Sequence, residues 1–210
     1  MTGRIHIDLF TTLDGVAQAP GGPDEDPSSG FPYGGWQAPL IGAVDGQSVG
    51  EGIAAMDALV MGRRTYDIFA SYWPQHSGPD SEIADKFNSI AKYVASRSAL
   101  TLDWAGTTQL GEDAVADVSA LREKHENIHV IGSVDFVQSL LAAAAFDVLT
   151  LWVYPVVLGQ GKKVFPDGAA PTTLEQSEPP LVSAKGAVLL RYGPAGEVRT
   201  GDMGDPDRDA

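Results

Sequence analysis

The sequence predicts an α/β fold with a mainly parallel central sheet, helices on both faces and an antiparallel C-terminal edge. Two observations lead to this prediction. Short apolar segments alternate with segments of helical periodicity over most of the 210 residues. The last two apolar segments, 147–159 and 186–193, follow one another without a helical pattern between them, so we expect them to pair antiparallel.

The composition predicts one domain. The chain is 43% hydrophobic, which is enough for one real core, and its length is short for two. We expect this domain to occupy residues 1–193. Residues 194–210 contain almost no apolar side chains, so we expect an acidic, disordered tail there.

The N-terminal half begins with a strand at 3–10, where polar and apolar residues alternate. An Asp-Gly pair, Asp14 and Gly15, interrupts this pattern. Residues 19–35 are rich in Pro, Gly, Asp and Ser, which predicts a long loop. A weak helix, a buried strand and two amphipathic helices are expected next, at 45–57, 58–61, 65–73 and 81–91.

Breaking and capping residues support these boundaries. Pro74 ends the helix at 65–73, and Ser81 is expected to cap the helix that follows. In the C-terminal half, Gly159 stops a long apolar strand. The expected C-terminal elements are strands at 92–96, 128–132, 147–159 and 186–193, and helices at 116–127 and 134–146.

The charge and composition exclude several classes of function. A formal net charge of −14 disfavours binding to nucleic acid and to anionic membranes. The chain has no cysteine, and its four histidines are scattered, so we expect no metal site. The N-terminus lacks the features of a signal peptide, and no apolar run approaches the roughly 20 residues that span a bilayer. We therefore expect a cytoplasmic protein whose partner is a small molecule.

Two junctions, each with a strand, a glycine and a helix, are candidate anion sites. Residues 61–65 read Met-Gly-Arg-Arg-Thr, and residues 130–134 read Val-Ile-Gly-Ser-Val. The first turn of a helix exposes unpaired N–H groups, and glycine lets a phosphate approach the backbone. Arg63 and Arg64 stand out in so acidic a chain and strengthen the first site. The alternative is a tight turn, with Arg64 as a surface arginine.

The motifs "TTLDGVA", "ALVMGRRTYDIF", "IHVIGS" and "VLTLWVYPVVLGQGKKVFPD", in this order, resemble the dihydrofolate reductase superfamily. The nearer branch is the reductase domain of bacterial bifunctional riboflavin-biosynthesis proteins and its stand-alone relatives. The resemblance extends over residues 4–192 and implies a dihydrofolate reductase-like fold. The zinc deaminase domain of the bifunctional proteins is not expected, because its Cys and His signature is missing.

The resemblance implies NADPH as the cofactor. The Gly-Arg turn would bind the pyrophosphate, Ser96 and Arg97 would bind the adenosine 2′-phosphate, and the backbone around residues 13–17 would lie beside the nicotinamide. Dihydrofolate reductases usually have Gly-Gly at the second turn, often with a cis peptide, whereas this chain has Gly-Ser, which leaves the isomer open. The cofactor-binding residues implied are Asp14, Gly15, Ala17, Gly62, Arg63, Arg64, Thr65, Ser96, Arg97, Ile131, Gly132, Ser133 and Val134.

The sequence offers several candidates for the residues that would contact the substrate. A carboxylate on the helix before the Gly-Arg turn would bind the substrate and assist protonation. Asp45 is the candidate, with Glu51 and Asp57 as competitors, and a helix-capping role is the alternative for Asp45. Trp36 and Tyr33 in the long loop, and Tyr154 on the long strand, are the substrate-contact candidates, with a core role as the alternative. We expect residues 19–36 to form a mobile lid that Trp36 closes.

The expected function is NADPH-dependent hydride transfer to a small heterocyclic substrate, such as a ribosylated pyrimidine or a pterin-like ring. The alternative is a non-catalytic nucleotide- or pterin-binding protein of the same fold. A homodimer is also expected. Related reductases commonly pair, and one monomer was not expected to bury both faces of the strand at 147–159.

Overall fold

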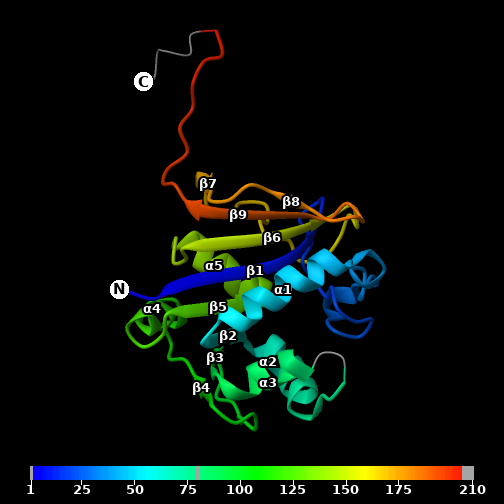
Figure 1. The fold of residues 1–210 in the computed structure, drawn as a ribbon. Coiled ribbons are helices and arrows are strands. Elements are labelled where there is room, and N and C mark those ends of the chain that lie inside the picture. Colours follow the sequence, from blue (N-terminus) through cyan, green and yellow to red (C-terminus); the bar gives the residue numbers. More distant parts are fainter. Residues whose placement is uncertain (1, 79–80, 205–210) are drawn as a thin grey trace.

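The computed structural model describes residues 2–78 and 81–204, without the side chains of residues 43–45. Its strands are β1 (Arg4–Thr12), β2 (Ala58–Gly62), β3 (Ala91–Ala95), β4 (Thr107–Gln109), β5 (Asn127–Ile131), β6 (Val148–Tyr154), β7 (Leu174–Gln176), β8 (Leu181–Val182) and β9 (Val188–Pro194). Within the described residues they form one sheet in the order β4-β3-β2-β5-β1-β6-β9-β7, and β8 also pairs with β9 (Figure 1). The strands from β4 to β6 are parallel, and β7, β8 and β9 pair antiparallel.

Helices cover both faces of this sheet. They are α1 (Ala43–Ala55), α2 (Arg63–Tyr72), α3 (Ser81–Ser89), α4 (Ala114–Ala120) and α5 (Val134–Ala142). Side chains of α1, α2 and α3 pack with Leu59 and Met61 on one face. Side chains of α4 and α5 pack with Val60 on the other face. The predicted fold class is therefore confirmed.

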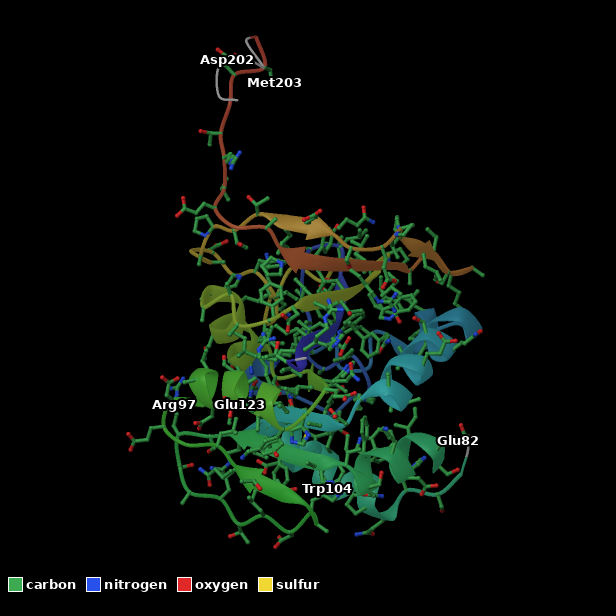
Figure 2. The ribbon with its side chains drawn as sticks, turned by 60° about the vertical axis from the view of Figure 1, so that its left-hand side comes forward. Glu82, Arg97, Trp104, Glu123, Asp202 and Met203 are labelled. Atoms are coloured by element: carbon green, nitrogen blue, oxygen red, sulfur yellow. The ribbon has the colours of Figure 1, made fainter. Side chains whose placement is uncertain are left out.

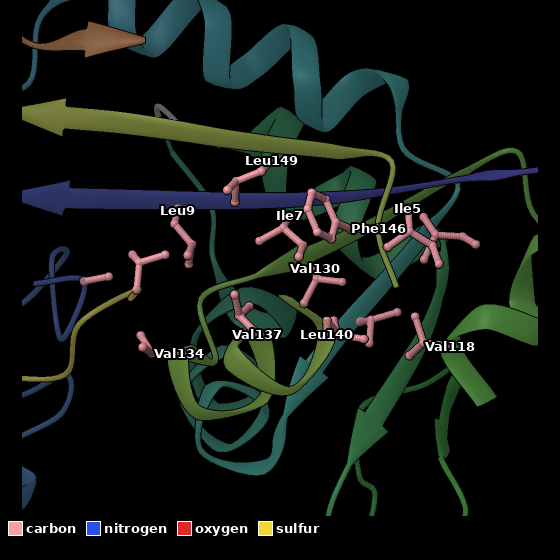
Figure 3. Packing of buried hydrophobic residues seen from close by; sticks show 14 of the residues in the cluster. Ile5, Ile7, Leu9, Val118, Val130, Val134, Val137, Leu140, Phe146 and Leu149 are labelled. Atoms are coloured by element: carbon pink, nitrogen blue, oxygen red, sulfur yellow. The ribbon is translucent and has the colours of Figure 1, made fainter. Parts of the chain in front are cut away.

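The core between β1 and α5 follows from the alternation of side chains along β1. Ile5, Ile7 and Leu9 are buried and point to the α5 face, where they meet Val137 and Leu140 (Figure 3). The side chains between them, at positions 6, 8 and 10, point to the opposite face. This alternation decides which β1 residues reach the α1 side of the sheet.

Some predicted elements are shorter than expected. α4 begins at Ala114, because the Asp113 side chain accepts a hydrogen bond from the Ala116 N–H group at 3.0 Å. The expected helix at 116–127 ends early, because the N–H groups of Glu126 and Asn127 donate to the Asp57 carboxylate at 2.8 and 2.9 Å. These hydrogen bonds fix the backbone where β5 begins.

β6 ends at Tyr154 and not at Gly159. Pro155 has no N–H group for the ladder, and the Asp14 carboxylate accepts hydrogen bonds from the N–H groups of Leu158 and Gly159 instead, at 3.2 and 2.7 Å. Similarly, α5 stops at Ala142, before a turn at Ala144 with φ of 49°. Strands β4, β7 and β8 were not expected, because segments of two or three residues are too short to show a period.

Burial of β6 does not require a homodimer. β6 lies between β1 and β9, and within one chain the exposed fractions of Leu149, Trp152 and Tyr154 are 0%, 3% and 0%. These residues belong to the cores on both faces, so one chain buries both faces of the strand. The homodimer stays a prediction that rests on the resemblance alone.

The chain leaves the sheet after β9. The Ala195 N–H group still donates to the Thr173 carbonyl at 2.8 Å, and residues 198–204 are exposed. Figure 2 shows Asp202 and Met203 far from the body of the molecule. Residues 205–210 of the expected tail lie outside the described residues. No helix in the described part of the chain is long and apolar enough to cross a membrane.

Lys92 on β3 is fully buried beneath α3. Its ammonium group donates to the carbonyls of Phe87 and Ile90, both at 2.8 Å, and lies 4.8 Å from the centre of the Trp104 ring. Burial lowers the pKa of Lys92 from 10.5 to about 8. The residue therefore links folding to pH in the alkaline range.

Between these two pKa values the unfolded chain holds a proton that the folded protein has released, so stability rises with pH. We expect this contribution to reach about 1.4 kcal/mol per pH unit at most. Urea unfolding of the wild type and of Lys92→Met at pH values across this window measures it. The variant should lose this rise, whereas Lys124→Met, at an exposed lysine, should keep it. Equal pH slopes for Lys92→Met and the wild type would contradict the prediction.

Candidate cofactor and substrate site

The two predicted junctions lie side by side and are joined by hydrogen bonds. β2 and β5 are parallel neighbours, with Val60 paired to Val130, so their carboxyl ends reach the same edge of the sheet. The Gly62 N–H group donates to Ser133 Oγ at 2.7 Å, and the Ser133 N–H group donates to Thr65 Oγ1 at 3.1 Å. Ser133 Oγ in turn donates to Thr65 Oγ1 at 2.9 Å.

The backbone of the second junction adopts a conformation that favours glycine. Gly132 and Ser133 have φ values of 60° and 57°, and their peptide bond is trans. A left-handed serine costs about 1–3 kcal/mol, which the hydrogen bonds to Gly62 and Thr65 help to offset. A Cβ atom at Gly62 would lie 3.3 Å from Ser133 Cβ, so only glycine allows the junctions to approach this closely without a shift.

A cavity of about 1440 Å³ opens beside these junctions. This exceeds the roughly 300–1000 Å³ of a typical ligand pocket, so a dinucleotide and a second small molecule would fit together. The first turns of α2 and α5 line it, and the first N–H groups of a helix largely lack a partner within it. In α5, the Phe136 N–H group donates to the Ser133 carbonyl at 2.8 Å. The predicted cofactor residues that line the cavity are Ala17, Gly62, Arg63, Arg64, Thr65, Ser96, Arg97, Ile131, Gly132, Ser133 and Val134. Asp14 and Gly15 do not line it; Asp14 holds the segment after β6.

Hydroxyl groups and arginines gather at one rim of the cavity. Arg63 donates to Ser98 Oγ at 3.0 Å and lies 3.6 Å from the Asp67 carboxylate. Ser96 Oγ donates to the Ser98 carbonyl at 2.8 Å. The side chain of Arg97 is exposed at the edge of the molecule (Figure 2). This group of donors beside the first turn of α2 suits a phosphate monoester.

A chain of ion pairs crosses another part of the rim. The Asp26 carboxylate lies 3.1 Å from Arg64 and 3.2 Å from Lys162, and Lys162 lies 3.3 Å from Asp135 on α5. Burial raises the pKa of Asp26, but hydrogen bonds from Ser28 and Lys162 outweigh it and hold the pKa below its usual value. Asp26 thus stays a carboxylate and binds the long loop to both sides of the cavity. Asp26 and Lys162 were not predicted from the sequence as residues of this site.

A polar pair on the floor of the cavity was also missed. Asp8 lines the cavity from β1, and His129 on β5 donates from Nδ1 to Asp8 Oδ2 at 2.6 Å. The ring of His6 stacks on that of His129, with centroids 4.5 Å apart. Burial, and then the neighbouring His129, lower the pKa of His6 to about 4, so His6 is neutral near pH 7. The alternation of β1 places His6 and Asp8 on one face, but only the register of β1 with β5 brings His129 to them.

Sequence comparison agrees with this geometry. Residues 4–179 match the family described as the RibD C-terminal domain. The chain belongs to the RibD C-terminal domain family. The match covers most of the chain and confirms the resemblance to the reductase domain of riboflavin-biosynthesis proteins. Family and fold together support a reductase-type function, that of an oxidoreductase.

Individual proteins resemble the chain in sequence or in fold at low identity. The uncharacterized protein YyaP of Bacillus subtilis is 26% identical over 171 residues, which cover 78% of this chain and 81% of that protein. A pyrimidine reductase-like protein of Corynebacterium diphtheriae has a TM-score of 0.61 at 14% identity, over 94% of this chain and 93% of that one. Dihydrofolate reductase of Enterococcus faecalis, in complex with NADP(H), has a TM-score of 0.55 at 16% identity, over 93% and 98% of the two chains.

In this member of the RibD C-terminal domain family, the long loop is not a free lid. The Gln18 side-chain amide donates to the carbonyls of Asp26 and Ser28 at 2.9 and 3.1 Å, and its oxygen accepts from the Lys162 N–H group at 3.0 Å. Asp26 adds the ion pairs described above. The expectation of a mobile segment followed from its Gly and Pro content. In the structure, buried polar groups hold this segment in place, and the lid stays a prediction.

The three predicted substrate contacts also need correction. Trp36 is only 8% exposed, its Nε1 donates to the Gln18 carbonyl at 2.9 Å, and its ring meets Tyr154 edge-on at 5.7 Å. Tyr154 is fully buried and accepts a hydrogen bond from Gln37 at 2.7 Å. Tyr33 is 44% exposed and packs on Phe31. None of these three aromatic side chains lines the cavity.

The predicted catalytic carboxylate lies partly beyond what the structure describes. Asp45 belongs to α1, but its side chain lies outside the described residues. Its competitors do not line the cavity: Glu51 accepts a hydrogen bond from Gln47 at 3.0 Å, and Asp57 binds the backbone before β5. Asp45 stays a prediction.

The packing of Trp36 predicts a large effect on stability. Trp36→Ala should lower the free energy of unfolding by about 3–5 kcal/mol, because it empties a core site and removes a buried hydrogen bond. Tyr33→Ala, in the same loop but half exposed, should cost much less. Urea unfolding followed by circular dichroism measures both. A Trp36→Ala protein of wild-type stability with a raised KM would restore the lid hypothesis.

Proposed function

We propose that the chain is an NADPH-dependent reductase that transfers hydride to a C=N or C=O bond of a small, planar, heterocyclic substrate. The observation that carries the proposal is the joined pair of junctions at Gly62 and Ser133. Two helix N-termini open into one cavity there, with arginines at its rim. Such an arrangement suits a pyrophosphate held from two sides.

The residues present fit NADPH in three places. The pyrophosphate would lie on the first turns of α2 and α5, where Gly62 and Gly132 permit close approach. The 2′-phosphate would bind Ser96, Arg97 and Ser98, where hydroxyl donors and a cation occur together. The nicotinamide would lie beside Ala17 and supply the hydride when bound. The Enterococcus faecalis enzyme of the same fold is in complex with NADP(H), which supports this choice.

The work of the protein is to position the two ligands and exclude water. Asp26, through Arg64 and Lys162, closes one rim of the cavity. The hydrogen bonds among Gly62, Thr65 and Ser133 fix the two turns relative to one another, so the cofactor would meet a preorganised site.

One observation favours the alternative of a non-catalytic nucleotide- or pterin-binding protein. The Asp26 carboxylate forms an ion pair with Arg64, which would otherwise be free to bind the pyrophosphate. Titration with NADPH followed by its fluorescence tests cofactor binding. Loss of NADPH absorbance with candidate pyrimidine and pterin substrates then separates the two functions. Binding of both ligands without turnover would favour the alternative.

The rim near Ser96 predicts a preference for NADPH over NADH. Arg97→Ala should weaken NADPH binding about tenfold or more, because it removes a charge-assisted contact to the 2′-phosphate, and should leave NADH binding unchanged. Arg199→Ala removes the same charge from the exposed tail and serves as the control. Fluorescence titration measures all three proteins. Equal affinity of the wild type for NADPH and NADH would refute this preference.

A further inference from the structure

We propose that Asp8, held by His129, anchors the substrate, and that the site takes an unphosphorylated heterocycle that offers N–H donors. The inference rests on the proposed reductase function, because it names the substrate class of that same cavity. It starts from a partly buried polar pair that the cofactor would not need.

Asp8 lies close to the proposed cofactor position. In the β1–β5 pairing it is opposite Ile131, the residue before Gly132. Adjacent strands are about 4.8 Å apart, so the Asp8 backbone is one strand away from the second anion-binding turn. Its side chain lines the cavity on the α1 face of the sheet. A molecule that contacts this carboxylate would therefore lie next to a bound dinucleotide.

The pair is built to hold the carboxylate in one place. The His129 side chain is 7% exposed and that of Asp8 is 31% exposed. His129 is braced by the stacked ring of His6 and donates to one Asp8 oxygen. In the described part of the chain His129 is the only hydrogen-bond partner of the carboxylate, and a carboxylate can accept about four hydrogen bonds. Most of its acceptor capacity is thus free for a ligand.

The surroundings suit a planar ring. Phe10 follows Asp8 on the same face of β1 and meets Tyr154 edge-on at 6.2 Å. Gln37 donates to the Tyr154 hydroxyl, so Phe10 and Gln37, which both line the cavity, belong to the same end of it. An aromatic side chain beside a few fixed polar groups is typical of a site for a small heterocycle.

Among the described residues, no lysine or arginine forms an ion pair with Asp8. The cationic side chains that line the cavity, among the described residues, are Arg63, Arg64, Arg97 and Lys162. Three of them pair with Asp67 or Asp26, and Arg97 stands beside Ser96 and Ser98 at the proposed 2′-phosphate site. A phosphate on the substrate would need a cation and would meet the Asp8 carboxylate instead, which repels it. The site therefore selects against phosphorylated substrates.

Two probes test this selection on the unaltered protein. The first is 2,4-diaminopyrimidine, which offers N–H donors, and the second is uridine 5′-monophosphate, a phosphorylated ribosyl pyrimidine. Calorimetric titration is carried out with and without saturating NADP⁺. We expect the diaminopyrimidine to bind at least about tenfold more tightly. Tighter binding of uridine 5′-monophosphate, or no measurable binding of the diaminopyrimidine, would overturn the proposal.

Variants then assign the effect to Asp8. Asp8→Asn should weaken diaminopyrimidine binding about tenfold or more, and Asp8→Glu should restore part of it. Glu112→Gln removes another cavity carboxylate and should bind as the wild type does. Unfolding midpoints identify any variant that does not fold, in which case the comparison of probes on the wild type still decides. A folded Asp8→Asn protein with unchanged affinity would overturn the assignment.

The two binding measurements distinguish failure of the Asp8 proposal from failure of the proposed reductase function. If NADPH does not bind but the diaminopyrimidine binds through Asp8, the reductase proposal fails and the anchoring role stands. If NADPH binds and is specific, but Asp8→Asn leaves probe binding unchanged, the anchoring role fails alone. Each proposal therefore has its own decisive readout.

Discussion

The structure depends on one contact between two junctions that are 71 residues apart in the chain. Ser133 Oγ accepts from the Gly62 N–H group and donates to Thr65, while the Ser133 N–H group donates to the same threonine. The contact requires that β2 and β5 be parallel neighbours, that Gly62 lack a side chain and that Ser133 adopt a left-handed conformation. Each of these features costs free energy or limits the sequence, and together they direct two helix N-termini into one cavity.

Charge pairing explains how so acidic a protein could keep the proposed anion-binding site. The net charge of −14 would weaken the attraction for a dinucleotide, but the cations of the cavity are concentrated at its rim. Asp26 binds Arg64 and Lys162 and so connects the loop, α2 and the segment after β6. The same pairing that closes the rim also reduces the positive charge available to a ligand. A phosphorylated substrate and a phosphorylated cofactor would therefore meet very different surroundings within the cavity.

The two faces of the sheet have different roles. On the α5 face, β1 presents Ile5, Ile7 and Leu9, which form the core. On the α1 face it presents His6, Asp8 and Phe10, which lead from a buried histidine stack to the cavity. Buried polar groups are costly unless they are paired, and the bond between Asp8 and His129 supplies a partner for these two residues. Among the described residues, His6 Nε2 is buried without a hydrogen-bond partner. The same strand thus contributes apolar side chains to the core and polar side chains to the cavity.

The sequence by itself determined the α/β class, the six longer strands and the two glycine junctions, because period and turn chemistry are local properties that short windows reveal. It also pointed to arginines and serines that the structure places along the cavity. Tertiary structure alone decided the rest. The loop around Trp36 reads as mobile until Gln18 and Asp26 find partners far along the chain, and Tyr154 becomes core only between two neighbouring strands. Asp8 and His129 are 121 residues apart, and only the register of β1 with β5 makes them a pair, because no local pattern encodes which strands become neighbours.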